Sequence, residues 1–234
     1  MPGPAVLIDE EYASQFARPA RDLGVRVIGA VERSGQEELQ LEYGSAYVEH
    51  LQAMNPDGVK VLLRWDPEGD AALNGRQGEL LAGVSASIAA IGVPLIVEFL
   101  TPPDPSSTKR TETMVLAIEQ ILAAGAEPAM WKVEGLDTTE GCQAVADAIS
   151  IGGREATAIV LGRGVTLDSA VGWLEAAAPV PRFNGFAIGK TVWQDPLVAV
   201  LRGERSGAEG AADISRRYRR LVDTWTNARN RAGF

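Results

Sequence analysis

The sequence is poor in the side chains that most often bind metal ions, because its 234 residues include one cysteine, Cys142, and one histidine, His50. A single cysteine cannot form an internal disulfide, and its rarity is typical of a reducing compartment. Ordinary zinc sites need several histidine or cysteine ligands, so we expect no metal and no cofactor. His50 lies in the helical pattern AYVEHLQAM, which predicts a surface or helix-packing histidine rather than a catalytic base.

Basic surfaces and long apolar runs are also missing. The net charge of −9 and the pI near 4.8 argue against a nucleic-acid partner, which usually needs a basic face. No basic start followed by an apolar core is visible, and no apolar run is long enough to span a bilayer, so we expect a cytoplasmic protein without a membrane partner. With 46% hydrophobic residues and no linker or low-complexity tract, we expect one globular domain over 1–234.

Short β-branched runs alternate with longer helical patterns along the whole chain. Helical spacing is clear in ETMVLAIEQILAAGA and YGSAYVEHLQAM. This alternation predicts parallel strands joined by helical crossovers, a fold of the α/β class. The expected strands cover 5–9, 26–32, 59–65, 94–100, 129–134, 157–162 and 184–189.

Two parallel architectures compete for this pattern, an open doubly wound sheet and a closed TIM barrel. An open dinucleotide-binding sheet should show a glycine-rich turn after its first strand, and LIDEEYASQ has none. Nearly every expected strand ends in charged residues or glycine, as a TIM barrel needs at its catalytic face. We therefore favour the barrel. Only seven strands are visible where a complete barrel has eight, so we expect the first βα unit to be missing or unseen.

The four lysines stand out among eighteen arginines. Lys109 lies in DPSSTKRTET, which we expect to be a loop with a solvated charge, whereas Lys60, Lys132 and Lys190 lie in or directly after apolar strands. Burial disfavours the charged form of an amine, and a neutral amine attacks a ketone to form a Schiff base. We therefore expect Lys132 to capture a carbonyl group.

Strand alternation places Met130, Lys132 and Glu134 on one face of a strand. By the same rule, Lys60 and Glu98 face inward on the two preceding strands, so all three functional groups could converge in the barrel mouth. A second cation, Lys60, would disfavour the charged form of Lys132, and the Glu98 carboxylate could move protons. The alternative is a salt-bridged network that fills the barrel core.

The last two expected strands end in LGRG and IGKT, before the helical pattern VWQDPLVAVL. Glycine lets backbone N–H groups approach an anion, and a helix N-terminus adds positive potential. We expect a phosphate site at Gly162, Arg163, Gly164, Gly189 and Lys190, although such glycines also serve tight turns. The later segment RRYRRLVDTW could form an anion patch, but an amphipathic helix with a solvated basic face is favoured. We expect the trailing NARNRAGF to be a frayed end.

The stretches VLIDEEY, VERSGQEELQLEYG, VKVLLRWDPEGDAALNGRQ, VEFLTPP, WKVEGLD, IVLGRG, GFAIGKTVWQDPL and RRYRRLVDTW resemble the 2-deoxy-5-keto-gluconate 6-phosphate aldolase family. This domain also occurs fused behind 5-dehydro-2-deoxygluconokinase in inositol breakdown. The sequence is more distantly similar to the class I tagatose-bisphosphate and sulfofructose-phosphate aldolases. The resemblance covers essentially the whole chain. It implies a TIM barrel that cleaves a phosphorylated keto sugar acid to dihydroxyacetone phosphate and malonic semialdehyde, without a metal.

The resemblance also carries over residue by residue. It implies that Lys132 is the imine lysine, that Glu98 is the catalytic carboxylate and that Lys60 is the second lysine. The glycine loops carry over as phosphate ligands, with Lys190 at a position that is usually arginine in the family, where the charge is kept but the bidentate fork is lost. Substrate hydroxyl or carboxylate contacts are expected from Asp9, Glu32 and Arg64.

Family members begin with a further strand and helix, whereas this chain starts with MPGP directly at the second strand. A barrel without its first strand would expose an edge, which favours association into a homo-oligomer. Two other functions stay open. One is a related aldolase for another phosphorylated ketose, and the other is a catalytically silent barrel that binds a phosphorylated metabolite or a protein.

Overall fold

The computed structural model describes residues 3–104 and 106–234, with the side chains of residues 11 and 12 left aside. The chain forms two compact units. Unit 1 comprises Met1–Pro103, Glu112–Trp131 and Gly152–Ala156, and unit 2 comprises Asp104–Thr111, Lys132–Ile151 and Thr157–Phe234. The expectation of a single domain over 1–234 stays a prediction.

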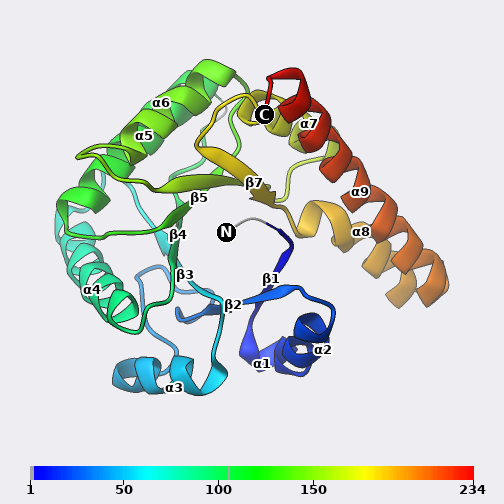
Figure 1. Ribbon diagram of the computed structural model, residues 1–234, viewed down its shortest axis with the longest axis horizontal. Coiled ribbons are helices and arrows are strands. Elements are labelled where there is room, and N and C mark those ends of the chain that lie inside the picture. The colour runs from blue at the N-terminus through cyan, green and yellow to red at the C-terminus, as the bar shows by residue number, and fades with distance from the viewer. Residues whose placement is uncertain (1–2, 105) are drawn as a thin grey trace. The chain divides into compact units, whose positions relative to one another are not determined.

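Unit 1 contains four parallel strands that pair in chain order. They are β1 (Ala5–Ile8), β2 (Arg26–Ala30), β3 (Gly58–Arg64) and β4 (Leu95–Leu100). Helices flank this sheet on one side (Figure 1). They are α1 (Glu10–Ala13), the 3-10 helix η1 (Ser14–Phe16), α2 (Ala17–Asp22), the 3-10 helix η2 (Gly44–Ala46), α3 (Tyr47–Met54), α4 (Ala71–Ala90) and the greater part of α5 (Ser107–Ala123).

The alternating side chains of β3 explain how this unit presents functional groups. Val59, Val61 and Leu63 are completely buried, as expected for the face packed by helices. Lys60 and Arg64 lie on the opposite face, and their exposure rises towards the carboxyl end of the strand. In the register with β4, Lys60 is opposite Ile96 and Leu62 is opposite Glu98. Lys60 and Glu98 are therefore diagonal neighbours on one face of the sheet.

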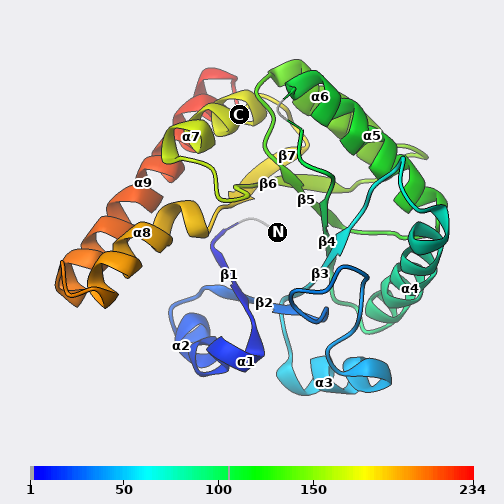
Figure 2. The same ribbon diagram turned by 180° about the vertical axis from the view of Figure 1, so that it is seen from behind.

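Unit 2 contains the end of β5 (Met130–Glu134) and two parallel strands, β6 (Thr157–Leu161) and β7 (Phe183–Ala187). Its helices are α6 (Thr139–Ile149), α7 (Leu167–Ala177), α8 (Lys190–Leu201) and α9 (Gly207–Arg231). Figure 2 shows α7, α8 and α9 lying side by side, and α9 packs against both of the others. A capping box fixes the start of α9, since Ser206 and Glu209 bond each other's backbone N–H groups.

The structure confirms all seven expected strands, with shifts of one or two residues at their ends. His50 lies in α3 and stacks on Tyr43, which confirms a helix-packing role. Two expectations were wrong. Lys109 lies in the first turn of α5, and α9 continues to Arg231 instead of fraying, because the Arg229 guanidinium donates hydrogen bonds to three backbone carbonyl groups.

Within the described ranges, no helix is long and apolar enough to cross a membrane.

Candidate functional site

Lys60 lies between two carboxylates in unit 1. Its side chain is 8% exposed, and its Nζ forms an ion pair with Oε1 of Glu32 and lies 3.6 Å from Oε2 of Glu98. All three residues are buried, although charged side chains are almost never buried without partners. The expectation that Lys60 and Glu98 share a face is therefore confirmed, and Glu32 joins them.

Glu32 has an unusual environment for a carboxyl group. Burial raises its pKa above the usual value, although the Lys60 ammonium acts in the opposite direction. Its Oε2 atom is buried and has no hydrogen-bond partner among the described residues. Such a group holds a proton more readily than an exposed glutamate does.

A hairpin formed by residues 33–40 covers this cluster. It is closed by the antiparallel bridge of Glu32 with Leu41, and Leu39, close to this bridge, is held by the buried side chain of Gln77. The Gln77 amide accepts a hydrogen bond from Leu39 N at 3.0 Å and donates one to Arg64 O at 2.9 Å. A cavity of about 130 Å³ lies beneath the hairpin, lined in part by Glu32, Lys60 and Arg64.

The other two expected residues of unit 1, Arg64 and Asp9, contact the hairpin. The exposed Arg64 forms an ion pair with Glu37 at 3.5 Å, and Asp9 accepts a hydrogen bond from the Ser34 hydroxyl at 3.4 Å. Both partners belong to the hairpin. Arg64 is thus held by a carboxylate that is 89% exposed, which makes the pair easy to exchange.

Lys132 lies on β5, between the completely buried side chains of Trp131 and Val133. Its own side chain is half-buried, on the same face as Glu134. The alternation expected for this strand is therefore confirmed. Lys132 belongs to unit 2 and Lys60 to unit 1, and the expected convergence of their side chains stays a prediction.

The loop after β5 is fixed by a polar cluster around Asp137. The Asp137 carboxylate accepts hydrogen bonds from Arg110 Nη2 at 2.6 Å and from Trp173 Nε1 at 2.7 Å. Burial opposes its charged form, but these donors prevail and lower the pKa of Asp137. Gly135 passes so close to Trp173 that a Cβ atom there would lie 2.1 Å from the indole.

The glycine turn after β6 has the left-handed geometry that its sequence suggests. Arg163 and Gly164 have φ values of 40° and 78°, and Val165 N donates a hydrogen bond to Gly162 O at 2.9 Å. A Cβ atom on Gly162 would lie 2.8 Å from the Ile188 side chain, so close packing requires glycine there as well. The Arg163 guanidinium binds the Glu134 carboxylate.

The helix α8 begins beside this turn. Gly189 is its N-cap and offers no side-chain cap, and Thr191 donates a hydrogen bond to Val165 O at 2.8 Å. Together the turn and the helix start border a cavity of about 660 Å³. Of the five expected phosphate ligands, Gly164 and Lys190 line it, whereas Gly162, Arg163 and Gly189 do not.

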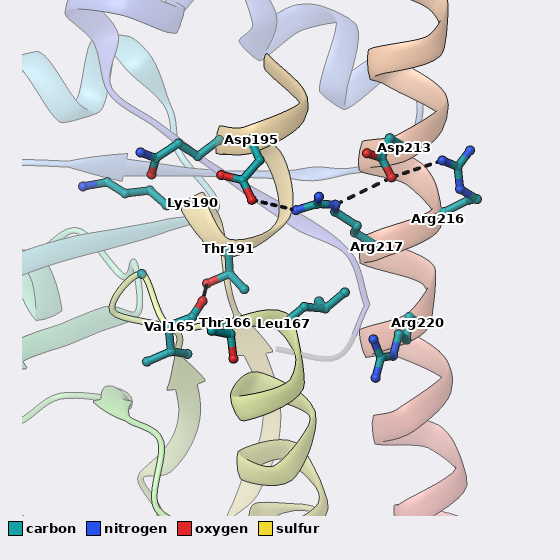
Figure 3. A pocket seen from close by; sticks show the side chains of 12 residues that line it. Val165, Thr166, Leu167, Lys190, Thr191, Asp195, Asp213, Arg216, Arg217 and Arg220 are labelled. Atoms are coloured by element: carbon teal, nitrogen blue, oxygen red, sulfur yellow. Dashed lines mark hydrogen bonds and ion pairs between the residues drawn. The ribbon is translucent and has the colours of Figure 1, made fainter. Parts of the chain in front are cut away.

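The remaining charged lining of this cavity comes from α8 and α9. Figure 3 shows Lys190 on one side and the arginines of α9 on the other. We call this cavity the arginine pocket, after Arg216, Arg217 and Arg220. The sequence favoured an amphipathic helix with a solvated basic face, and Arg216 and Arg220 are indeed exposed on α9, where they also line the cavity. The lining acids Asp195 and Asp213 carried no signal in the sequence.

The chain belongs to the DUF2090 family, described as "Uncharacterized protein conserved in bacteria", whose model matches residues 2–229. No curated protein matches the sequence.

Two solved structures share the fold. Cgl0159 from Corynebacterium glutamicum is 17% identical with a TM-score of 0.59, and the match covers 82% of this chain and 63% of that one. Fructose-bisphosphate aldolase from Plasmodium falciparum is 10% identical with a TM-score of 0.71, covering 96% of this chain and 76% of that one. The expected fold is therefore confirmed as an α/β fold of the TIM-barrel type, similar to that of an aldolase.

Proposed function

From the aldolase-like fold of this DUF2090 chain and the placement of its lysines, we propose that the protein is a metal-independent class I aldolase that acts through a Schiff base on Lys132. Its substrate is a phosphorylated keto sugar acid, 2-deoxy-5-keto-gluconate 6-phosphate, and its products are dihydroxyacetone phosphate and malonic semialdehyde. The substrate rests on the sequence resemblance, and the reaction class rests on the fold and on unit 2.

One chain of contacts in unit 2 carries the proposal. Lys132 shares a strand face with Glu134, and Glu134 binds Arg163 in the glycine turn. The next residue, Gly164, borders the arginine pocket together with Lys190. The strand that bears the amine is thus tied directly to the loop that we propose holds the phosphate, which supports a substrate anchored near Lys132.

The proposed reaction begins when the Lys132 amine adds to the substrate ketone and forms a carbon–nitrogen bond. Loss of water gives a protonated imine, with Glu98 moving the protons. Removal of the proton from the β-hydroxyl group then breaks the bond between the α and β carbons. Its electron pair moves into the imine, malonic semialdehyde leaves, and an enamine remains on Lys132. Protonation of the enamine carbon and addition of water release dihydroxyacetone phosphate and restore the lysine.

In this proposal, Lys60 holds the Glu98 carboxylate in place as well as binding substrate oxygens, because it contacts Glu98 and Glu32 together. Asp9, Glu32 and Arg64 contact the hydroxyl and carboxylate groups of the sugar acid. A related phosphorylated ketose would use the same amine but would not need Arg64.

The compensated charge of Lys60 also favours a second candidate, a silent barrel that binds a phosphorylated metabolite. In that case the buried ion pairs serve stability alone, and the imine does not form.

Borohydride reduction in the presence of dihydroxyacetone phosphate, followed by peptide mass spectrometry, separates these functions. We expect a reduced adduct on Lys132, lost in Lys132→Arg and kept in Lys109→Arg, where the substituted lysine lies in the first turn of α5. An adduct on Lys60 or Lys190 would keep the reaction class and overturn the assigned nucleophile. No adduct on folded protein would favour the silent barrel.

A further inference from the structure

We propose that the arginine pocket binds a small molecule with two phosphate groups, one held at Gly164 and Lys190 and the other by the arginines of α9. This inference goes beyond the proposed function, whose substrate carries a single phosphate group, and rests on it only for the role of Gly164 and Lys190. It assigns a ligand class to Arg216, Arg217 and Arg220.

The first argument is the local sign of the charge. The chain has a net charge of −9, yet the pocket is lined by four cationic side chains and two carboxylates. A cavity with an excess of one sign raises the local concentration of ions of the opposite sign. In an acidic protein, such an excess of cations is informative because it is not shared by the molecule as a whole.

The second argument is the spacing of the cations. Lys190 extends from the start of α8 on one side of the cavity, while Arg216 and Arg217 extend from α9 on the other (Figure 3). The cavity of about 660 Å³ falls within the usual range for small-molecule sites, about 300–1,000 Å³, and is far larger than one phosphate requires. Separate groups of cations around one roomy cavity suit a ligand with two anionic groups.

The third argument is that the present ion pairs are easy to exchange. Arg217 lies 3.3 Å from Asp195, whose side chain is 83% exposed, and Arg220 lies 2.7 Å from Asp168, whose side chain is 84% exposed. Exposed ion pairs of this kind contribute little to stability. A phosphate group carries more charge than a carboxylate and accepts bidentate hydrogen bonds from a guanidinium, so it can replace them.

Asp213 has a different role from these two acids. Its side chain is 14% exposed. The Asp213 carboxylate accepts hydrogen bonds from the guanidinium groups of Arg205 at 2.8 Å and Arg216 at 3.1 Å, and Arg217 Nε lies 3.6 Å away. Burial opposes its charged form, but the surrounding arginines lower the pKa of Asp213. Asp213 therefore stays charged and aligns the arginines, while Asp195 occupies the position of a ligand anion.

The competing explanation is an ion-pair lattice that only joins α8 to α9. The variant Asp195→Asn separates the two, because it removes a negative charge from the pocket and takes away one of the two carboxylate partners of Arg217. If the pocket binds phosphate groups, this variant binds them more tightly. If the ion pairs serve only to hold the helices, the variant gains no affinity for phosphate groups.

The test is calorimetric titration of the full chain with inorganic phosphate, pyrophosphate and a hexose 1,6-bisphosphate. We expect at least one of the two-phosphate probes to bind roughly tenfold more tightly than inorganic phosphate, with binding weakened by added salt because the site is partly exposed. Pyrophosphate and the bisphosphate distinguish adjacent from separated phosphate groups. Equal binding of all three probes, or none, overturns the proposal.

Variants assign the binding to this pocket. Arg217→Ala should weaken the binding of the preferred probe by about tenfold, as expected for a lost charge-assisted contact. Arg219 lies on the same helix but outside the pocket lining, so Arg219→Ala should leave the binding of the probe unchanged. Thermal melting and circular dichroism identify any variant that fails to fold, and the tighter binding expected of Asp195→Asn provides a gain of function that unfolding cannot imitate.

The outcome is also separable from that of the proposed reaction. Lys132 lies outside the pocket lining. The variant Lys132→Arg therefore loses the proposed nucleophile but should bind the two-phosphate probe like the unaltered protein. Binding without any borohydride adduct would retain the pocket and refute the aldolase. If an adduct forms on Lys132 but the protein shows no preference for two phosphate groups, the aldolase is retained and the two-phosphate pocket is refuted.

Discussion

Replacing Gly135 with alanine tests the packing of the segment that directly follows Glu134. An added Cβ atom would lie 2.1 Å from Trp173 Cε3 and 2.2 Å from Cδ2, far inside van der Waals contact. The backbone of Gly135 is not in the left-handed region, so the whole effect comes from this overlap. Trp173 is 6% exposed and cannot simply swing into solvent. We expect the indole to shift and its hydrogen bond to Asp137 to break.

The expected cost has two parts. Overpacking of a buried site costs about 1–3 kcal/mol. A hydrogen bond to a charged group contributes about 1.5–3 kcal/mol, and the half-exposed Asp137 carboxylate places this one near the lower limit. The sum of roughly 3–4 kcal/mol is a large part of the usual 5–15 kcal/mol of stability. For a chain of this length it corresponds to a fall in melting temperature of about 10 °C.

The matched control is Gly172→Ala, directly before Trp173 in the same helix. A Cβ atom there meets nothing within 4 Å, and alanine is the better helix former by about 0.5–1 kcal/mol. Calorimetric melting of both variants should therefore show opposite shifts. The double variant Gly135→Ala with Trp173→Leu should be less destabilised than the sum of its parts, because the indole that causes the clash is gone. A Gly135→Ala protein that melts like the unaltered one would refute this packing.

Three further outcomes follow from the buried titratable groups. Lys60→Met leaves Glu32 and Glu98 buried without the cation they share, so urea unfolding at neutral pH should show a loss of about 3–5 kcal/mol, and a smaller loss in acid, where the Glu32 carboxylate is protonated. The pKa of Glu32 is raised from its usual 4.5, so its contribution to stability is complete below pH 4.5 and is lost as the pH rises through the pKa of the folded state. Glu32→Gln should therefore flatten the plot of unfolding free energy against pH in this window. An unchanged slope would contradict the raised pKa of Glu32. Burial raises the pKa of Cys142 to about 12, and the side chain is 1% exposed, so the native thiol should resist a disulfide reagent at pH 8 and react quickly in urea.

The strands and the charged face of β3 were predictable because they depend on local patterns. The period-two alternation of Val59, Lys60 and Val61 determines which face each side chain takes, and the structure confirms it. The glycine turn was predictable for a similar reason, since the left-handed backbone at Gly164 favours glycine.

Side-chain partners across the fold were not predictable in this way. The phosphate role expected of Arg163 stays a prediction, but its protein partner, Glu134, lies 29 positions away in the sequence and was not expected. Arg229 was expected in a frayed end, but it donates to the carbonyl groups of Ala178, Val180 and Phe183. The α9 arginines show helical spacing, which specifies a face but not the neighbour of that face. In each case the decisive contact is long-range, and the sequence alone contains no signal for it.

The different surroundings of the two strand lysines bear directly on which is the nucleophile. If the Lys60 amine lost its proton to attack a ketone, Glu32 and Glu98 would lose the cation they share, which is costly for buried charges. Lys60 is thus better suited to orient carboxylates than to form an imine. Lys132 lies on a strand whose Glu134 binds Arg163, in the loop that we propose holds the phosphate. The position of a trapped adduct therefore tests the structure as well as the reaction, because an adduct on Lys60 would require the buried carboxylate cluster to open.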